Sequence, residues 1–267
     1  MADVVVAGAA GRMGSRIIAC LATEGDLRVA AALEAAAHPS IGRDAGEAAG
    51  VARLGVPITA DAKAALTAGR VLVEFSEPEA TLDHLRAVAA AGGGAVIGTT
   101  GFTAEQRDEI ARLATSCPVV LSPNMSVGVT LAFKILDIMA RALGGEYDVE
   151  ITEVHHRFKK DAPSGTALRM AEVVAGALGR DLQQIGVYGR RGVPGQRTRD
   201  EIAVLSLRSG DVVGEHTVSF GALGERLELT HRAHSRDTFA RGALRAARFV
   251  VDRPAGLYSM HDVLGLT

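Results

Sequence analysis

The sequence predicts an α/β protein with two domains: a doubly wound parallel sheet comes first, and an α+β domain with a four-stranded mixed sheet follows. In the first half, short continuous apolar runs alternate with helical segments, which is typical of a parallel sheet covered by helices on both faces. After residue 124 the pattern changes to long helices and alternating strands. A length of 267 residues is enough for two domains of ordinary size.

Composition limits the classes of partner. The net charge of −2 gives no overall attraction to nucleic acid or to an anionic membrane. The N-terminal segment lacks the features of a secretory signal, and no run reaches the roughly 20 apolar residues of a spanning helix. We therefore expect a cytoplasmic protein without nucleic-acid or membrane partners. Cys20 and Cys117 are too few for a disulfide framework and are expected to be buried thiols.

The first domain is expected to contain strands joined by helices. A strand over DVVVA leads through a glycine-rich turn into a helix over residues 13–21. Pro78 lies near the start of one later helix, and Thr103 with Gln106 forms a capping-box pattern at the start of another. Right-handed crossovers through such helices place the strands parallel. The further strands are expected at residues 27–34, 70–76, 94–101 and 118–124.

The second domain is expected at residues 125–235, after a first domain of residues 1–124. Two segments have helical periodicity, VGVTLAFKILDIMARAL and SGTALRMAEVVAGAL, and residues 147–155 alternate like a half-exposed strand. The next three strands, EIAVLSLR, VVGEHTVSF and ERLELTHRA, are joined by short turns, so we expect antiparallel hairpins. The last segment, RDTFARGALRAARFVVDR at residues 236–253, is expected to be a helix that could close either domain.

Three glycines directly after the first strand indicate a dinucleotide site. Gly8, Gly11 and Gly14 lead into a helix whose N-terminal amides a pyrophosphate could approach. Glu34 ends the second strand, 20 residues beyond Gly14, where an acid can accept hydrogen bonds from a ribose diol. Ala10 stands where the commoner fingerprint has glycine. An ordinary strand-to-helix turn is therefore the alternative interpretation.

Two further loops follow strand ends of the same sheet. They are GTTG at residues 98–101 and SPNMS at residues 122–126. Ligands of open parallel sheets bind beyond the carboxyl ends of the strands, and small residues there leave room for a flat ring such as nicotinamide. Turns and helix caps are the alternative interpretation of both loops.

A basic cluster directly precedes a helix start in the second domain. At that start, Ser164, Gly165 and Thr166 offer free backbone amides and two hydroxyls, a cradle for an anion such as a carboxylate. Such a local positive field suits a multiply anionic small molecule, whereas a solvated surface run is the alternative. Five basic side chains lie just before the cradle: His155, His156, Arg157, Lys159 and Lys160.

Two other chemistries fit this segment poorly. Adjacent histidines on a strand point to opposite faces, and no third ligand is spaced to join His155 or His156 at a metal ion. We therefore expect no metal site. Ser164 lacks the G-x-S-x-G elbow that surrounds many acyl-transfer nucleophiles.

The chain resembles the 4-hydroxy-tetrahydrodipicolinate reductase (dihydrodipicolinate reductase) family in seven segments that follow the same order along nearly its whole length: VAGAAGRMG, EFSEPEATLDHL, GTTGF, SPNMSVGV, EVHHRFKKDAPSGTAL, GEHTVSF and SRDTFARGAL. The histidine-rich segment is highly specific, whereas many dehydrogenases share the glycine turn. The resemblance implies a Rossmann-type first domain and a substrate domain that builds a homotetramer through its sheet. It also implies that a C-terminal helix, within residues 236–267, returns to the first domain.

The resemblance further implies an activity and the residues that carry it. The reaction would be hydride transfer from NADH or NADPH to C4 of a cyclic dicarboxylate in lysine and diaminopimelate biosynthesis. The 4-hydroxyl would leave as water, and an enamine-like carbon would be protonated. Catalytic roles are implied for His155 and Lys159, and substrate contacts for His156, Gly165 and Thr166. Cofactor contacts are implied for Gly8, Ala9, Ala10, Gly11, Arg12, Met13, Glu34, Gly98, Thr99, Thr100, Ser122, Pro123, Asn124 and Met125.

One position departs from the family pattern, and two alternatives stay open. Members that use NADPH well often carry arginine after the acid, whereas Ala35 follows Glu34 here, so we expect NADH to bind at least as well as NADPH. Arg12 could still reach a 2′-phosphate, so we expect both cofactors to be used. The first alternative is another NAD(P)-dependent dehydrogenase of the same architecture, because fold does not determine substrate. The second is a cofactor-sensing protein without catalysis. The presence of both His155 and Lys159 beside the cradle argues against such a sensor.

Overall fold

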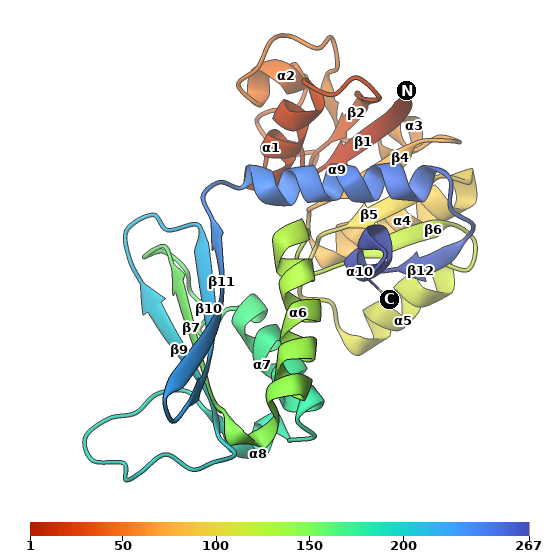
Figure 1. Cartoon of the computed structure of the whole chain (residues 1–267). Coiled ribbons are helices and arrows are strands. Elements are labelled where there is room, and N and C mark those ends of the chain that lie inside the picture. The colour runs from red at the N-terminus through yellow and green to blue at the C-terminus, as the bar shows by residue number, and fades with distance from the viewer. Residues whose placement is uncertain (267) are drawn as a thin grey trace. The chain divides into compact units, whose positions relative to one another are not determined.

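The computed structural model describes residues 1–266 and divides the chain into two compact units (Figure 1). The first unit contains Met1–Val127 and the chain from Arg236 onward, and the second contains Gly128–Ser235. The division lies close to the boundary expected at residue 124. A chain that leaves the first unit at one end of a helix and returns to it 108 residues later makes the second unit an insertion in the first.

The first unit contains a seven-stranded, entirely parallel sheet in the order β12-β6-β5-β4-β1-β2-β3. The two edge strands, β3 and β12, were not expected, because they are two and three residues long and too short to show a pattern of their own. The strands are β1 (Ala2–Ala7), β2 (Leu27–Leu33), β3 (Ile58–Thr59), β4 (Val71–Glu74), β5 (Gly94–Ile97), β6 (Pro118–Leu121) and β12 (Gly256–Tyr258).

Helices cover both faces of this sheet. One core joins α1 and α9 to the sheet, and the other joins α4 and α5 to it. Val4 and Val6 of β1 belong to the first core and Val5 to the second, which is why the strand is apolar without alternation. The helices are α1 (Arg12–Leu21), α2 (Ala45–Ala48), α3 (Ala62–Ala65), α4 (Pro78–Ala91), α5 (Ala104–Leu113), α9 (Asp237–Val251) and α10 (Met260–Leu264).

Residues 236–266 do not form the single C-terminal helix that was expected over residues 236–267. The segment belongs to the first unit, but α9 ends at Val251, and Pro254 follows, which has no N–H to continue a helix. Beyond it, β12 pairs in parallel with β6, and α10 packs its Met260 into the same core as α9. The segment therefore contributes a helix, an edge strand and a final short helix to this unit.

The second unit contains a five-stranded mixed sheet in the order β11-β10-β7-β9-β8. It has one strand more than expected, because two residues after α8 pair in parallel with β9. α6 and α7 pack on one face over a core that includes Leu136, Ile151, Met170 and Phe220. The elements are α6 (Val127–Leu143), η1 (Gly144–Glu146), β7 (Asp148–His155), α7 (Gly165–Ala177), α8 (Leu182–Ile185), β8 (Gly186–Val187), β9 (Ile202–Arg208), β10 (Gly214–Ala222) and β11 (Glu225–Ala233).

The hairpin prediction was right for one pair of strands and wrong for the other. β10 and β11 form an antiparallel hairpin. β9 and β10 are not neighbours, because β7 lies between them, parallel to β9 and antiparallel to β10. The turn after β9 instead crosses the end of β7, where the Ser209 N–H donates to the His155 carbonyl at 2.8 Å. Alternation identifies a strand but not its partner.

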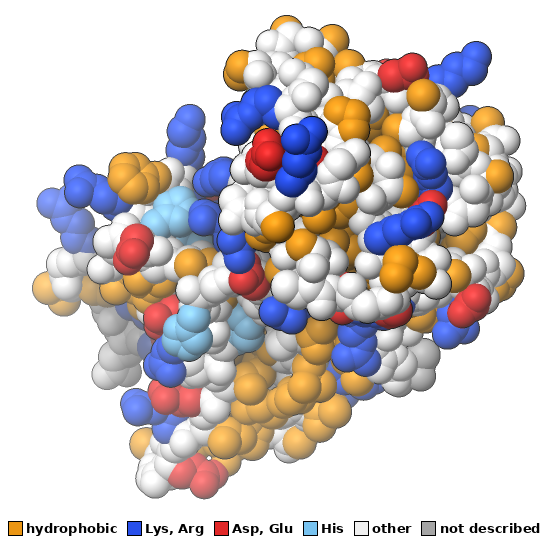
Figure 2. Space-filling view, turned by 90° about the horizontal axis from the view of Figure 1, so that it is seen from above, with side chains coloured by type: hydrophobic (Ala, Val, Ile, Leu, Met, Phe, Trp, Pro, Cys, Tyr) orange, Lys and Arg blue, Asp and Glu red, His pale blue; other side chains and the backbone are white. Residues whose placement is uncertain are grey.

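The visible surface (Figure 2) carries charges of both signs, and both cysteines are buried. On the face shown in Figure 2, Lys and Arg side chains lie with Asp and Glu side chains among them. Cys20 and Cys117 are buried free thiols, as predicted. Within residues 1–266, no helix has the length and apolar character needed to cross a membrane.

Candidate active site

The carboxyl edge of the parallel sheet holds the loops that the sequence singled out. In three places a residue just after one strand donates a backbone hydrogen bond to the last residue of the neighbouring strand, so the loops begin at the same edge. The bonds run from Ala9 N–H to Leu33 O (3.0 Å), from Gly98 N–H to Glu74 O (2.9 Å) and from Ser122 N–H to Ile97 O (3.1 Å). The glycine turn and both small-residue loops therefore belong to one edge of the first unit.

The backbone conformation and the close contacts of the turn after β1 require glycine. Gly8 has a φ of 69°, and a Cβ there would lie 2.7 Å from the Phe75 carbonyl oxygen. A Cβ on Gly14 would overlap the Gly8 carbonyl. Gly11 is the N-cap residue of α1, and its N–H donates to Gly8 O at 2.9 Å. The tight turn brings the α1 N-terminus to the sheet edge, where its amides can meet a pyrophosphate.

Glu34 reaches from the end of β2 to the glycine turn. Its Oε2 accepts the Ala10 N–H at 2.9 Å, and its Oε1 accepts the Ala35 N–H at 3.0 Å. The side chain is partly exposed, so ribose hydroxyls can also reach the carboxylate. A turn that only glycine can adopt, beside an acid and a helix N-terminus, fits the adenosine diphosphate half of a pyridine nucleotide.

The other two predicted loops divide into structural and accessible residues. Thr99 is buried, and its hydroxyl lies 3.0 Å from that of Thr81. The Ser122 hydroxyl donates to Asn124 O at 2.7 Å, and Met125 packs into the core. Thr99, Ser122 and Met125 therefore shape the loops. The side chains that remain partly or fully exposed are Thr100, Pro123 and Asn124.

Sequence reasoning missed a carboxylate under these loops. Glu74 is fully buried at the end of β4, where Oε1 accepts the Ser76 N–H at 2.9 Å and Oε2 lies 2.7 Å from His84 Nδ1. The ring of Phe75 lies so close to Gly98 that a Cβ on this glycine would overlap it. An acid directly after an apolar strand, at the same edge as the other loops, was the available signal.

A second buried carboxylate joins both parts of the predicted substrate site in the second unit. Glu153 on β7 is fully buried. Its Oε2 lies 2.6 Å from His155 Nδ1, and its Oε1 accepts the Ser164 N–H at 3.1 Å. Arg208 on β9 donates from Nη1 to both oxygens, at 3.0 and 2.9 Å. One side chain thus holds both His155 and the start of α7.

Strand register explains this grouping. Glu153 and His155 are two residues apart on β7, so they share a face of the sheet. Arg208 on β9 is the register partner of His155, and His216 on β10 is the register partner of Glu153. Sequence reasoning missed the roles of Glu153, Arg208 and His216. Period-two spacing before His155 was a signal for the first, whereas the other two require the strand pairing.

A second histidine supports the anion cradle. Ser164 is the N-cap residue of α7, where its hydroxyl accepts the Ala167 N–H at 3.2 Å and lies 3.0 Å from His216 Nε2. Burial lowers the pKa of His216 to about 3, so this ring is neutral near pH 7. Gly165 follows on the exposed side, and a Cβ there would meet nothing within 4 Å. The Ser164 N–H, expected to be free, is bonded to Glu153, so the part of this helix start that is open to a ligand is the space in front of Gly165.

The loop after β7 carries the remaining predicted residues. The Lys159 ammonium donates to Asp161 Oδ2 at 2.9 Å, and one-fifth of its side chain is exposed. The carbonyl of Asp161 accepts from Arg208 at 2.6 Å, which links this loop to Glu153. His156 Nδ1 is buried and has no hydrogen-bond partner within residues 1–266, so it is available to a ligand.

Charges around His155 act in opposite directions. Burial lowers the pKa of His155, whereas the Glu153 carboxylate raises it, and the positive charges of Lys159 and Arg208 lower it further. Burial also raises the pKa of Glu153, but hydrogen bonds from His155, Ser206 and Arg208 outweigh this and leave the pKa below its usual value. At neutral pH the pair is therefore an ionised carboxylate and a neutral imidazole.

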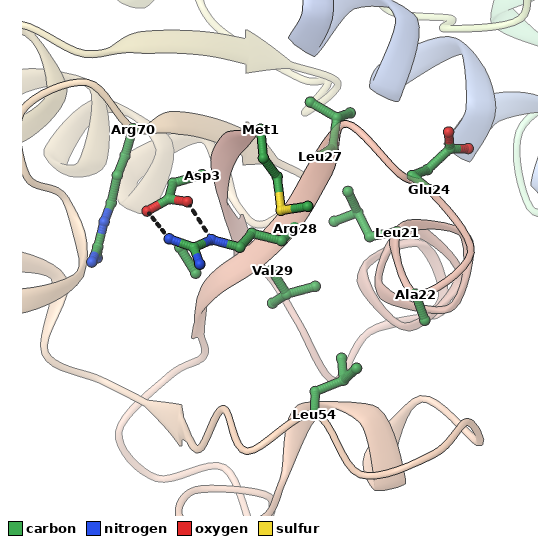
Figure 3. Close-up of a pocket in the computed structure, with 11 residues that line it drawn as sticks. Met1, Asp3, Leu21, Ala22, Glu24, Leu27, Arg28, Val29, Leu54 and Arg70 are labelled. Atoms are coloured by element: carbon green, nitrogen blue, oxygen red, sulfur yellow. Dashed lines mark hydrogen bonds and ion pairs between the residues drawn. The ribbon is translucent and has the colours of Figure 1, made fainter.

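Other parts of the described chain supply no second candidate of this kind. No group of three or more His, Cys, Asp or Glu side chains within residues 1–266 is arranged to hold a metal ion. A cavity of about 480 Å³ lies at the amino ends of β1 and β2, where Asp3 and Arg28 form an ion pair at 2.6 Å (Figure 3). None of the predicted site residues lines it.

Comparisons with known proteins cover both units. Family models described as dihydrodipicolinate reductase, N-terminus and C-terminus, match residues 2–125 and 128–264. Proteins named 4-hydroxy-tetrahydrodipicolinate reductase from Syntrophus aciditrophicus (strain SB) and Geobacter sp. (strain M21) are each 52% identical to the chain; the first match covers 99% of both chains and the second 100%.

Solved structures show the same architecture. A dipicolinate-bound dihydrodipicolinate reductase from Paenisporosarcina sp. TG-14 matches with a TM-score of 0.74 and 25% identity over 97% of both chains. An amine dehydrogenase from Mycobacterium smegmatis matches with a TM-score of 0.58 and 15% identity, over 97% of this chain and 95% of that one. The second similarity is one of fold alone.

Proposed function

The chain belongs to the dihydrodipicolinate reductase family of NAD(P)H-dependent oxidoreductases, and from this premise we propose how its own residues reduce 4-hydroxy-tetrahydrodipicolinate. The single observation that carries the assignment is 52% identity to reductases of that name over the full chain. Other dehydrogenases share only the fold, so they give no support to a different substrate. The product, tetrahydrodipicolinate, serves lysine and diaminopimelate biosynthesis.

In this proposal the first unit holds the pyridine nucleotide. The α1 amides and the turn from Gly8 to Met13 receive the pyrophosphate, and Glu34 receives the adenosine ribose. The accessible residues of the two other loops, Thr100 and Asn124 among them, border the nicotinamide. The bound dihydronicotinamide supplies the hydride.

NADH is expected to bind at least as well as NADPH. The Glu34 carboxylate favours a neutral ribose diol and repels a 2′-phosphate, and Ala35 offers no compensating charge. Arg12 is exposed at the start of α1 and can offset part of that repulsion, so both cofactors should be used. Titration of each cofactor into the wild-type protein checks this. An affinity for NADPH more than about tenfold higher, about 1.4 kcal/mol, would contradict it.

The second unit holds the dicarboxylate in the same proposal. One carboxylate accepts the amides of Gly165 and Thr166, whose helix start is fixed by Ser164, and His156 Nδ1 offers a further contact. Arg157 and Lys160 are exposed and increase the local positive potential that attracts a dianion.

Lys159 is proposed as the proton donor. When hydride arrives at C4, electron density increases on the neighbouring carbon, and an ammonium within hydrogen-bond reach can protonate it as charge develops. In the structure this ammonium is bound to Asp161, which keeps it on the loop next to His156. His155 orients the substrate or shares the proton transfer.

The sheet of the second unit is proposed as the surface of a homotetramer. Its face away from α6 and α7 carries half-exposed and exposed side chains, including Thr152, Val154, Leu205 and Leu207. Sedimentation equilibrium of the wild type and of Leu207→Glu, which places a charge on that face, checks this. A monomeric wild type would contradict it. A cytoplasmic location belongs to the same proposal.

The decisive test of the activity is an assay of the purified chain. Loss of NADH absorbance should depend on 4-hydroxy-tetrahydrodipicolinate, and pyridine-2,6-dicarboxylate, a planar mimic of the substrate, should compete with it. Reduction of an unrelated keto or imino acid instead, with no reduction of the cyclic dicarboxylate, would favour the other-dehydrogenase alternative.

A further inference from the structure

We propose that Glu153 is a positioning residue for the reductase reaction. Its carboxylate holds the His155 ring with hydrogen on Nδ1, presents Nε2 to the reacting groups, and connects this ring to the helix start that receives a substrate carboxylate. The inference rests on the proposed roles of His155 and the α7 start. It adds a residue to which neither the sequence patterns nor the comparisons give a role.

The cost of burying Glu153 indicates a function beyond packing. A buried carboxylate is tolerated only when it is paired and hydrogen-bonded, and an apolar residue of similar size is often at least as stabilising. Glu153 is fully buried, with Oε1 bonded to Ser164 N–H and Arg208, and Oε2 bonded to His155 and Arg208. All four of these bonds therefore go to residues of the proposed site or to the arginine that neutralises the carboxylate.

The chemistry of the pair determines the tautomer. An ionised carboxylate can only accept hydrogen bonds, so the 2.6 Å contact requires the hydrogen to lie on His155 Nδ1. The neutral ring then carries a lone pair on Nε2. A Cβ on Gly214 would lie 3.0 Å from Nε2, so the glycine at this position of β10 leaves the space beside that nitrogen free of a side chain.

The same carboxylate couples His155 to the anion cradle. Ser164, whose N–H it accepts, is the N-cap residue of α7, and the amides of Gly165 and Thr166 follow directly. Displacement of Glu153 would therefore move both the ring and the helix start. Arg208 also bonds the carbonyl of Asp161, so the loop that carries Lys159 is attached to the same centre.

The groups that face His155 set the sign of the expected pH effect. Glu153 on β7 favours the protonated ring, whereas Lys159 on the following loop and Arg208 on β9 disfavour it. His216 on β10 meets the ring edge to face at 5.1 Å and is neutral, and Asp161 pairs with Lys159. When the Glu153 charge is removed, two cations remain, and the pKa of His155 falls further.

The test compares Glu153→Gln with a matched control, Glu150→Gln. Glu150 is on the same strand, is half-buried and binds two arginines, but it lies on the other face. In Glu153→Gln we expect kcat/KM to fall about 10- to 100-fold, by analogy with the loss of a hydrogen-bond partner that orients a metal-bound histidine. The limb of the pH profile that reports His155 should move to lower pH. NADH affinity should not change, and Glu150→Gln should show neither kinetic effect.

Nitrogen NMR of the wild type gives a test that needs no variant. The His155 signals should show the Nδ1-protonated tautomer, and the Nε2-protonated tautomer would overturn the proposal. An active wild type whose kinetics and pH profile survive Glu153→Gln would also overturn it. An inactive wild type would refute the proposed function instead, and the tautomer measurement would still decide the role of Glu153. If Glu153→Gln does not fold, Glu153→Asp, which keeps the charge, should retain the pH limb with a reduced rate.

Discussion

Gly165 differs from the glycines of the nucleotide turn in its surroundings. A Cβ on Gly8 would meet the Phe75 carbonyl at 2.7 Å, whereas a Cβ on Gly165 would meet nothing within 4 Å. The fold therefore requires glycine at position 8, whereas it leaves room for a side chain at position 165. A ligand at the start of α7 supplies a reason for glycine that the chain itself does not.

Gly165→Val tests that explanation. The side chain has room in the protein but would occupy the space in front of the α7 amides, so KM for the dicarboxylate should rise at least about tenfold, which corresponds to about 1.4 kcal/mol. NADH affinity should stay near the wild-type value. Gly176→Val, at another open position of the same helix, is the control. If steady-state kinetics show an unchanged KM, the cradle is not part of the site.

Lys159→Met separates proton donation from electrostatic attraction. Loss of a general acid should lower kcat by roughly 10²–10⁴, with folding and NADH binding intact. If Lys159 only attracts the substrate, KM rises, kcat holds, and the loss shrinks at high salt. Kinetics at two ionic strengths distinguish these outcomes. Lys160→Met, at the exposed neighbouring position, should show the second pattern only.

Among the elements, α9 supports a loop of the cofactor edge from more than 100 residues away in sequence. Gly242 of α9 lies against the Met125 carbonyl, and Met125 belongs to the loop after β6. Arg16 on α1 and Asp237 at the start of α9 form an ion pair at 2.6 Å. This pair connects α9 to α1, the helix that follows the glycine turn. The position of the loop thus depends on how closely α9 approaches it.

Gly242→Ala should disturb that approach. A methyl group would overlap the Met125 carbonyl, so we expect a loss of about 1–3 kcal/mol in the free energy of unfolding and weaker NADH binding. Gly176→Ala, where the methyl meets nothing, should stabilise or have little effect because alanine has the higher helix propensity. Urea unfolding and NADH titration provide both measurements. Wild-type stability in Gly242→Ala would show that the helix can shift without cost.

Short sequence patterns predicted single helices and strands well, but they did not predict which strands pair with one another. The capping box was confirmed, with Thr103 N–H donating to Gln106 Oε1 at 3.0 Å and Gln106 N–H to Thr103 Oγ1 at 3.2 Å. Its partners are three residues apart, so the sequence contains the whole interaction. The position of β7 between β9 and β10 depends instead on which strands bury their apolar faces together over α6 and α7.

For the whole molecule, the buried histidine under α7 predicts a loss of stability in acid. The pKa of His216 is about 3 in the folded protein, whereas it is about 6.5 in an unfolded chain. Below about pH 6.5, His216 is therefore protonated in the unfolded state, whereas in the folded state it becomes protonated only near pH 3. The free energy of unfolding should fall through this window by about 1.4 kcal/mol per pH unit, or about 2 kcal/mol at pH 5.

Urea unfolding at pH 7 and pH 5 checks this contribution. His216→Asn keeps a polar side chain near Ser164 but does not titrate in this range, so its stability should change less between the two pH values than that of the wild type, by about 2 kcal/mol. His38→Asn, which replaces a half-exposed histidine of the first unit, is the control. Equal pH dependence in the wild type and His216→Asn would contradict the prediction.

The amino-acid sequence by itself determined the parallel α/β unit, the glycine turn with its distal acid, and the helix start beside the basic cluster. These features depend on residues that are neighbours in the chain, or on apolar periods that one segment displays alone. Only the tertiary structure decided that Glu153, Arg208 and His216 meet behind His155, and that α9 supports the loop at Met125. Strand register and long-range packing bring these groups together, and both are set by the burial of several distant segments at once.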